Sequence, residues 1–444
     1  MNQLDKKVLK NIPGFLELLP NKQMLFNNMK NAIKEAYELY GFLPQETPII
    51  EKEEIILAKA GGETEKQIYT LKKGDNNLAL RFDLTVPLAR YVAVNNNELA
   101  FPYRRYQIGK VYRGEKPQRG RLREFYQCDV DIIGNETLDI SHDAEIISLI
   151  GYTFNKLKFN NFNIKINNRK LLTGLFKELK LEDKSKQILI IIDKIEKIGN
   201  EKVKLMLKDI EVEEENIDKI INFLSISENN ESNKNSENIL NKLQKLNIKN
   251  EIFNKGLEEL SNLITNLKMF KLNENNYSID LSIARGLDYY TGTVYETVLT
   301  DYKEIGSICS GGRYNDLAEN FINKKLPGVG MSIGLSRLFD GLDYLGYFNN
   351  QKESIAKVLV LPLTQNKEYA IDILNELRNN NIKAEIELSN KKIKNAINYA
   401  DKLNIPYVIF IGEDEISNKT VNIKNIFTKE EYNLTKEEYL KIIK

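Results

Sequence analysis

Tyr103 to Asp131 reads YRRYQIGKVYRGEKPQRGRLREFYQCDVD, which is an alternating segment, a short basic connection and a second alternating segment. Two sets of side chains alternate from Tyr106 to Arg113, the two-residue period of a β-strand. The connection from Gly114 to Arg121 contains glycine, proline and two arginines, which predicts a mobile, solvated turn that attracts anions. The returning segment places polar groups on one face, together with one ring: Arg123, Phe125, Gln127, Asp129 and Asp131. We therefore expect an antiparallel hairpin with one polar face and one mostly apolar face.

A hairpin with one wet face usually has only a structural role. Here the polar face combines an arginine fork suited to phosphate with an aromatic ring that can stack on a base. The amide and carboxylates beside them can orient a small cationic or polar ligand. The combination favours a binding site over a purely structural hairpin.

The order Arg113, Glu115, connection, Arg121, Phe125 resembles motif 2 of the class II aminoacyl-tRNA synthetases, and the longer string to Asp131 is similar to the histidyl-tRNA synthetase family. The resemblance implies an α/β (α+β) fold, with a class II synthetase-type antiparallel sheet flanked by helices, a helical insertion and a C-terminal α/β domain of the anticodon-binding type. It also implies that these four residues bind ATP and that Arg113 is catalytic.

Length and composition limit the alternatives. A chain of 444 residues is expected to form two or three domains. With 64 Lys+Arg against 63 Asp+Glu, no strongly basic field indicates a nucleic-acid partner, so RNA binding would depend on local patches. Cys128 and Cys309 form no CxxC pair and His142 is the single histidine, which argues against a disulfide framework or a structural metal. The chemistry should depend on arginines, carboxylates, tyrosines and the backbone.

The charged N-terminal stretch lacks the apolar core of a signal peptide, and no stretch approaches the length of a membrane span. We therefore expect a soluble, cytoplasmic protein without a membrane partner.

Apolar positions recur at helical spacing from Asn21 to Tyr40, with Gly41 after the last of them. The continuation through Pro48 resembles class II motif 1, a helix followed by a strand that forms the dimer interface in that family. The resemblance implies a homodimer, although an ordinary helix and strand would give the same pattern.

The segment from Leu78 to Val94 predicts a strand followed by a helix with Pro87 in its first turn. Asp83 and Thr85 can simply cap this helix. The resemblance implies a second role, in which both residues hold the amino group of a histidine substrate.

Helical periods dominate between Asn135 and about Asn276. The polar tract from Ser225 to Asn238 predicts a flexible loop, because it has almost no apolar anchor. We predict a helical insertion at 168–270 within the catalytic domain, and the resemblance implies that it lies against the tRNA acceptor stem.

The string RGLDYYTG at 285–292 can be a tight turn with aromatic packing, but it closely resembles the histidine-binding motif of the family. The resemblance implies that Arg285 stabilises the reacting carboxylate and the α-phosphate, and that Asp131 accepts a hydrogen bond from the imidazole ring. The histidine-binding residues that it implies are Asp83, Thr85, Gln127, Asp131, Tyr289 and Tyr290.

Two glycine-rich clusters follow, CSGGRYNDL at 309–317 and PGVGMSIGLSRL at 327–338. The first allows close approach of the backbone to a ligand, and the second opens a helix whose N-terminus can face an anion. The second cluster resembles class II motif 3, which implies that Arg337 lies over adenine and meets the γ-phosphate.

From Lys357 onward short apolar strands alternate with helical stretches, which predicts a small α/β layer. It is similar in position and element order to an anticodon-binding domain, and a dimerisation or regulatory appendage is the alternative. The predicted domains are a catalytic domain at 1–350, interrupted by the insertion at 168–270, and a C-terminal domain at 355–444.

The resemblance implies that histidine is activated with ATP, accompanied by Mg²⁺, to histidyl-adenylate and is then transferred to the 3′ end of tRNA(His). The alternative is a non-catalytic, histidine-sensing regulatory subunit of ATP phosphoribosyltransferase, which typically lacks the C-terminal domain and has a degraded histidine motif. This chain keeps 357–444 and RGLDYYTG. That motif also disfavours synthetases for threonine, proline or glycine, and the retained arginines disfavour a catalytically silent tRNA sensor.

Overall fold

The computed structural model describes residues 8–58, 64–228, 235–283, 290–315, 318–349, 354–389 and 392–443. The chain forms two compact units. One comprises Met1–Glu17 and Asn28–Tyr347, and the other comprises Leu18–Asn27 and Phe348–Lys444.

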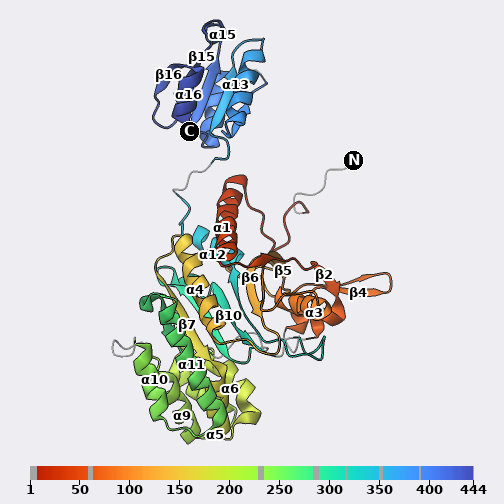
Figure 1. The fold of residues 1–444 in the computed structure, drawn as a ribbon, viewed down its shortest axis with the longest axis vertical. Helices are drawn as coiled ribbons and strands as arrows, with labels where there is room; N and C mark the ends of the chain where they lie inside the picture. Colours follow the sequence, from red (N-terminus) through yellow and green to blue (C-terminus); the bar gives the residue numbers. More distant parts are fainter. Residues whose placement is uncertain are drawn as a thin grey trace. The chain divides into compact units, whose positions relative to one another are not determined.

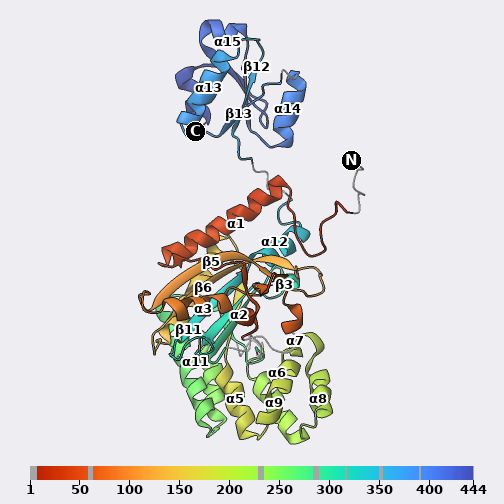
Figure 2. The same ribbon diagram turned by 90° about the vertical axis from the view of Figure 1, so that its right-hand side faces the viewer.

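An eight-stranded sheet organises the larger unit (Figures 1 and 2). In spatial order its strands are β1 (Leu43–Pro44), β5 (Tyr103–Tyr112), β6 (Glu124–Ile133), β11 (Gly328–Gly334), β10 (Cys309–Tyr314), β9 (Thr293–Leu299), β7 (Phe162–Asn168) and β8 (Tyr277–Ile279). The outermost pairs, β1 with β5 and β7 with β8, are parallel, and the other pairs are antiparallel. The antiparallel sheet with flanking helices confirms the predicted fold class.

Strands β5 and β6 form the predicted hairpin, and Gly109 pairs with Gln127 near its middle. Strand β5 ends at Tyr112, one residue earlier than predicted, although the N–H of Arg113 still donates to the carbonyl of Arg123 at 2.9 Å. The apolar side chains of Cys128 and Val130 are fully buried. The hairpin therefore divides into the two faces that its alternation predicts.

Three helices contact this part of the sheet: α1 (Pro20–Leu39), α4 (Ser141–Lys156) and α12 (Leu335–Tyr344). Helix α1 confirms the predicted N-terminal helix. Its buried Tyr37 donates a hydrogen bond to the carbonyl of Cys128 at 2.9 Å. Helix α4 packs against β10 and β11, and α12 packs against β6. The site is therefore built on a strand pair that helices hold in place.

A three-stranded sheet precedes the hairpin in sequence, in the order β2 (Ile50–Lys52), β4 (Asn76–Leu80), β3 (Thr70–Lys73). Helix α2 (Glu53–Leu57) follows β2, and α3 (Thr85–Asn95) follows β4. The predicted strand-to-helix step before Pro87 is confirmed.

The described residues between β7 and β8 form seven α-helices: α5 (Arg169–Glu178), α6 (Ser185–Ile192), α7 (Ile195–Ile198), α8 (Asn200–Asp209), α9 (Glu214–Ser225), α10 (Ser236–Lys245) and α11 (Glu251–Met269). They gather at one end of the large sheet (Figures 1 and 2), where α11 packs on α5 and α4. The predicted loop from Ser225 to Asn238 was too long. Asn235 accepts a hydrogen bond from the N–H of Glu237 and caps α10, because asparagine is a good helix cap as well as a loop residue. Residues 229–234 lie outside the described residues.

The second unit contains a five-stranded sheet, in the order β13 (Ala384–Ile386), β12 (Val358–Pro362), β14 (Tyr407–Ile411), β15 (Thr420–Asn425), β16 (Glu431–Thr435). Its helices are α13 (Glu368–Asn379), α14 (Ile393–Lys402), α15 (Glu413–Asn418) and α16 (Lys436–Ile443). The predicted α/β layer is confirmed, and the last two strands and last two helices extend it beyond the prediction.

Candidate active site

A cavity of about 430 Å³ opens on the polar face of β6 and β11. All of the predicted site residues that the structure describes line it: Asp83, Thr85, Arg113, Glu115, Arg121, Phe125, Gln127, Asp131, Tyr290 and Arg337. Two further predicted residues, Arg285 and Tyr289, lie outside the described residues. The hairpin, α3 and α12 thus bring together side chains that are up to 254 positions apart, from Asp83 to Arg337.

Strand register sets the order of groups along the cavity. Asp131, Asp129 and Gln127 of β6 pair with Gly330, Ser332 and Gly334 of β11. Gln127 and Asp131 are four positions apart on the strand, which corresponds to roughly 13 Å. The cavity therefore has room for distinct groups at its two ends.

Arg113 is held beside the Gln127 end. Its guanidinium lies over the Phe82 ring, 4.4 Å from the centroid, and 5.1 Å from the centroid of Phe125. Its Nε also donates to the carbonyl of Phe82 at 3.3 Å. The two rings and the carbonyl hold this cation in one orientation before any ligand arrives, so little reorganisation is needed to use it.

Arg337 lies three residues after Gly334, at the start of α12. Its Nε and Nη2 donate to the carbonyl of Ile305 at 3.1 and 2.9 Å. Burial, followed by the nearby charge of Arg121, lowers the pKa of Arg337. Arg121 itself is exposed and forms an ion pair with Glu115 at 3.4 Å. This end of the cavity is therefore rich in positive charge.

The connection between β5 and β6 contacts α12. The N–H of Gly120 donates to Asp340 at 3.2 Å, and the Arg119 guanidinium lies 3.3 Å from the centroid of the Tyr344 ring. The mobility predicted for this connection remains a prediction.

Asp83 combines the two roles that the sequence left open. Its Oδ1 accepts the N–H groups of Thr85 at 3.1 Å and of Val86 at 2.9 Å, so it caps α3. The side chain also lines the cavity and is only 5% exposed. Burial raises the pKa of Asp83, and the Val86 N–H and the charge of Arg113 partly offset this rise.

Asp131 belongs to a buried network. Its Oδ1 accepts the hydroxyl of Tyr314 at 3.0 Å, and its Oδ2 lies 2.9 Å from Nη2 of Arg105. Burial raises the pKa of Asp131, while Arg105 and the Tyr314 hydroxyl lower it. Because an ionised carboxylate has about four acceptor positions, Asp131 retains capacity for a ligand N–H.

Sequence reasoning missed two charged residues of this network. Arg105 is fully buried, and its Nη2 also donates to the carbonyl of Leu84 at 3.2 Å. Asp129 is 2% exposed and lines the cavity between Gln127 and Asp131. The alternation of β6 placed Asp129 on the polar face and could have identified it. No comparable signal marks Arg105, because its burial depends on partners far away in the sequence.

The first glycine-rich cluster forms strand β10, and its glycines pack against other parts of the protein. A Cβ added at Gly312 would lie 2.5 Å from the carbonyl oxygen of Thr293 and 2.9 Å from the Tyr290 ring. We predicted that a ligand would approach the backbone closely here. At Gly312 the groups that approach the backbone are instead the neighbouring strand and Tyr290. Glycine is required there so that the Tyr290 ring can reach the cavity.

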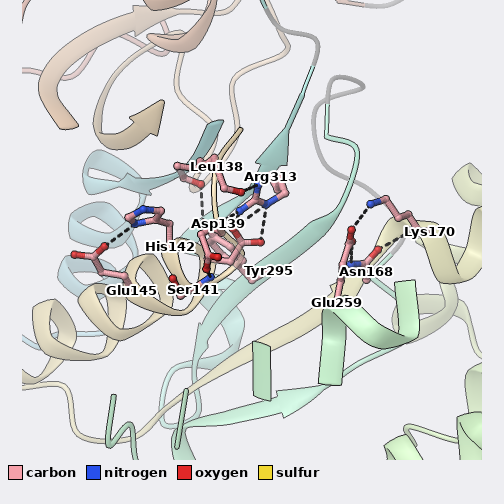
Figure 3. Close-up of polar contacts among 12 residues, drawn as sticks. Leu138, Asp139, Ser141, His142, Glu145, Asn168, Lys170, Glu259, Tyr295 and Arg313 are labelled. Atoms are coloured by element: carbon pink, nitrogen blue, oxygen red, sulfur yellow. Dashed lines mark hydrogen bonds and ion pairs between the residues drawn. The ribbon is translucent and has the colours of Figure 1, made fainter. Parts of the chain in front are cut away.

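Polar contacts tie the surrounding elements together (Figure 3). Arg313 of β10 binds the carboxylate of Asp143 and donates to the carbonyls of Leu138 at 2.9 Å and Asp139 at 2.8 Å, which anchors the start of α4. At the start of α5, Arg169 donates through Nη1 to the carbonyl of Tyr290 at 3.0 Å.

A second group of contacts joins α5 to α11. Asn168 donates to Glu259 at 2.9 Å, and Lys170 also binds Glu259 (Figure 3). Together with Arg169, these contacts hold the helices between β7 and β8 against the segment before β9 that contains Tyr290.

Clusters of metal ligands and membrane-spanning helices are both lacking among the described residues. No group of three or more His, Cys, Asp or Glu side chains in this part of the chain is placed to hold a metal ion. Among the helices of the same residues, none has both the length and the apolar character needed to cross a membrane.

The chain matches known proteins over nearly its whole length. A family model described as histidyl-tRNA synthetase matches residues 14–338, and one described as an anticodon binding domain matches residues 357–444. A histidine–tRNA ligase of Clostridium tetani is 52% identical over 98% of this chain and 97% of its own length. A crystal structure of histidyl-tRNA synthetase from Nostoc sp. superposes with a TM-score of 0.88 and 36% identity, covering 98% of each chain.

A structure from Bacillus halodurans, titled as an ATP phosphoribosyltransferase regulatory subunit/histidyl-tRNA synthetase, has a TM-score of 0.74 and 21% identity, covering 90% of this chain and 97% of its own. At this identity the likeness concerns the fold alone. The family match over residues 14–338 and the 52% identity of a full-length relative are decisive. The chain belongs to the histidyl-tRNA synthetase family.

Proposed function

We propose that the cavity on β6 and β11 is the active site of a histidine–tRNA ligase and that its two ends divide the substrates. The enzyme is a class II aminoacyl-tRNA synthetase of protein biosynthesis, which activates histidine with ATP and transfers it to tRNA. Histidine lies at the carboxylate end, near Asp83 and Asp131, with its amino group towards Gln127. ATP lies at the arginine end, near Arg113 and Arg337.

The observation that carries this proposal is the separation of charge within one cavity. Arg113, Arg121 and Arg337 lie near the Gln127 end, whereas Asp131 and the buried Arg105 lie at the opposite end of the register. An amino acid brings an ammonium group and a carboxylate, and ATP brings a chain of phosphates. The arrangement fits both substrates, and in the proposed pose the reacting carboxylate lies next to the arginines.

The proposed histidine contacts are those that the family resemblance implies, and all of them that the structure describes line the cavity. Asp83, Thr85 and Gln127 hold the amino group, and Asp131 accepts from a ring N–H while Tyr290 lines the ring pocket with Tyr289. A pocket that hydrogen-bonds the ring rejects amino acids without it, because its buried polar groups would be left unpaired.

The proposed chemistry needs little covalent help from the protein. The histidine carboxylate attacks the α-phosphate of ATP and pyrophosphate leaves, so catalysis consists of in-line positioning and offsetting of charge. Arg113, fixed between Phe82 and Phe125, faces the reacting groups, and Arg285 is proposed, from the motif that contains it, to stabilise the same groups. Phe125 and Arg337 enclose the adenine, while Glu115 and Arg121 contact the nucleotide from the β5–β6 connection. Mg²⁺ enters with ATP as part of the substrate.

The remaining assignments concern assembly. We propose a catalytic domain at 1–350 with an insertion at 168–270, and a C-terminal domain at 355–444 that binds the anticodon of tRNA(His). We also propose a cytoplasmic homodimer, formed in part by the segment after α1. Exposed apolar side chains in that segment support a dimer: Leu43 is 63% and Ile50 is 47% exposed.

The test is ATP–pyrophosphate exchange with the purified protein, run separately with each standard amino acid. Exchange with histidine alone is expected. A folded protein that binds histidine but exchanges pyrophosphate with no amino acid would instead match a histidine-sensing regulatory subunit.

A further inference from the structure

The carboxylate end of the cavity contains three aspartates, and the proposed histidine contacts involve only Asp83 and Asp131. Asp83, Asp129 and Asp131 are 5%, 2% and 3% exposed, and the fully buried Arg105 lies among them. Burying a charge is costly unless it is paired and hydrogen-bonded. Each carboxylate in this group therefore needs an identifiable partner.

All three acids have partners, and those of Asp129 are the hydroxyl of Ser332 and the charge of Arg105. Asp83 accepts two N–H groups of α3, and Asp131 contacts Tyr314 and Arg105. Among the described residues, Oδ1 of Asp129 has no hydrogen-bond partner, although it is buried in the wall of the cavity. Oε1 of the neighbouring Gln127 is likewise unpartnered within the described part of the chain.

The position of Asp129 indicates which group it meets. It lies between Gln127, which is proposed to hold the amino group, and Asp131, which is proposed to meet the ring. Residues two apart on a strand share a face and are roughly 7 Å from each other. Ser332, opposite Asp129 on β11, accepts the amide N–H of Gln127 at 2.7 Å, so Gln127 and Asp129 belong to one polar cluster.

Charge favours a cationic group over a neutral one. Arg105 is paired with Asp131 at 2.9 Å and its charge also acts on Asp129, but Asp129 has no ion pair of its own among the described residues. The ring of histidine is mostly neutral above its ordinary pKa of about 6.5, whereas an amino group of ordinary pKa remains charged at neutral pH. The α-ammonium is therefore the cation that the substrate brings.

We infer that Asp129 is a further substrate-binding residue, whose free carboxylate oxygen accepts a hydrogen bond from the α-ammonium of histidine. This inference rests on the proposed function, because it takes the cavity to be the histidine site. On this account, the buried oxygen of Asp129 gains its hydrogen-bond partner only when an amino acid is bound. It also gives the site a means to reject analogues that lack the amino group.

The experiment compares Asp129→Asn with the unchanged enzyme in pyrophosphate exchange. Asparagine keeps the shape of the side chain and removes its charge. The KM for histidine should rise roughly 10- to 100-fold, the effect of one lost charged hydrogen bond, while the KM for ATP should change less than about threefold. Glu124→Gln is the matched control, because Glu124 lies on the opposite face of the same strand and binds Lys110. It should leave both KM values within about twofold.

A ligand probe separates recognition of the ammonium from a general defect. Imidazole-propionate carries the ring and the carboxylate of histidine but no amino group, whereas histidinol carries the ring and the amino group. Calorimetry should show that Asp129→Asn weakens the binding of histidinol and leaves the binding of imidazole-propionate unchanged. Equal weakening of the two ligands, or no weakening of either, would overturn the inference.

The experiment remains decisive if the variant fails to fold or if the unchanged enzyme shows no exchange. If Asp129→Asn does not fold, Asp129→Ser is used in both measurements instead, because serine also removes the carboxylate and has a smaller side chain. If the unchanged enzyme shows no exchange, the proposed function fails. The calorimetric comparison then still decides whether Asp129 binds an ammonium group.

Discussion

Asp129 illustrates how a buried binding group affects stability. Burial raises the pKa of Asp129 from 3.8 to about 7, and Asp131 adds to the rise while Arg105 opposes it. The charged and titratable groups that face it or interact with it are Arg81, Asp83, Arg105, Asp131, Tyr37, Cys128 and Cys309. Because the folded protein binds this proton more tightly than the unfolded chain does, ionisation of Asp129 opposes folding.

The sign of the pH dependence follows. Between pH 4 and pH 7 the folded state holds one more proton at Asp129, so its contribution lowers the free energy of unfolding as pH rises and reaches its full cost above pH 7. Asp129→Asn should therefore raise the free energy of unfolding at pH 8 by roughly 1 to 4 kcal/mol and flatten this part of the profile. Urea unfolding at pH 5 and pH 8 measures both effects. A variant that is less stable at pH 8 than the unchanged enzyme would contradict this account.

Gly330 allows Asp131 to occupy its place beside β11. A Cβ added at Gly330 would lie 2.2 Å from Oδ1 of Asp131 and 2.6 Å from the carbonyl oxygen of Val130. Gly330→Ala should therefore lower the free energy of unfolding by roughly 1 to 3 kcal/mol, the usual cost of overpacking, and raise the KM for histidine more than that for ATP.

The control for Gly330→Ala is Gly334→Ala, on the same strand, where the nearest atoms to a new Cβ are 3.7 Å away. Its stability should stay close to that of the unchanged enzyme. Thermal unfolding of both variants, with exchange kinetics for Gly330→Ala, is the measurement. Equal stability of the two variants would show that Asp131 can move at no cost.

At the scale of single residues, the sequence predicted the side chains that alternation places on one face, including Phe125, Gln127 and Asp131. It did not predict which groups pair with the carboxylate of Asp131. Tyr314 and Arg105 reach Asp131 only through the pairing of β5, β6 and β11, which no local pattern specifies. Charged residues in strands are mostly exposed, so a buried Arg105 is contrary to the usual expectation.

Among the elements, α11 connects the helices that lie between β7 and β8 to the rest of the larger unit. Its N-terminus is capped by Asn250, whose Oδ1 accepts the N–H groups of Ile252 at 2.9 Å and Phe253 at 3.3 Å. Asn250→Ala leaves these donors without their cap and should cost about 1 kcal/mol of stability.

Asn250→Ser is the matched control, because serine caps helices nearly as well as asparagine. Hydrogen exchange of the amides in the first turn of α11 should quicken in Asn250→Ala and change little in Asn250→Ser. Equal exchange in the two variants would mean that packing of α11 on α5 and α4 fixes this end without the cap.

Sequence reasoning predicted elements best where they are long and strongly periodic. Helix α1 and the β5–β6 hairpin match their predicted spans within about two residues. Short elements were missed: β1 has two residues, and β15 and β16 follow α15 without a marked apolar run. The tract from Ser225 to Asn238 was predicted as a loop throughout, because asparagine and serine favour loops and helix caps alike.

At the scale of the whole molecule, the C-terminal unit has its own hydrophobic interior. One cluster, which includes Val360, Leu377 and Ile409, contains side chains of α13 and α16, and a second, which includes Leu361 and Ala400, contains side chains of α14. The order of strands and helices predicted this unit, since alternation with short connections indicates an α/β layer.

Removal of the C-terminal unit should separate amino acid activation from tRNA charging. The cavity is lined by residues between Gln67 and Arg337, so a chain that ends at Asn349 keeps every described group of the proposed site. Its histidine-dependent pyrophosphate exchange should retain KM values within about threefold. Some fraying at the start of α1 is expected, because Leu18–Asn27 belongs to the C-terminal unit.

Charging of tRNA should respond differently, because a tRNA held at both the anticodon and the acceptor end binds far more tightly than at one end alone. Losing one of two linked contacts typically weakens binding by 10² to 10⁴ fold, so the KM for tRNA should rise on that scale. The measurement is aminoacylation at increasing tRNA concentration with the shortened chain, with thermal unfolding to verify that it is folded. If charging were retained in full, the C-terminal unit would have a role other than tRNA binding. Loss of exchange in a folded shortened chain would place part of the activation machinery in that unit.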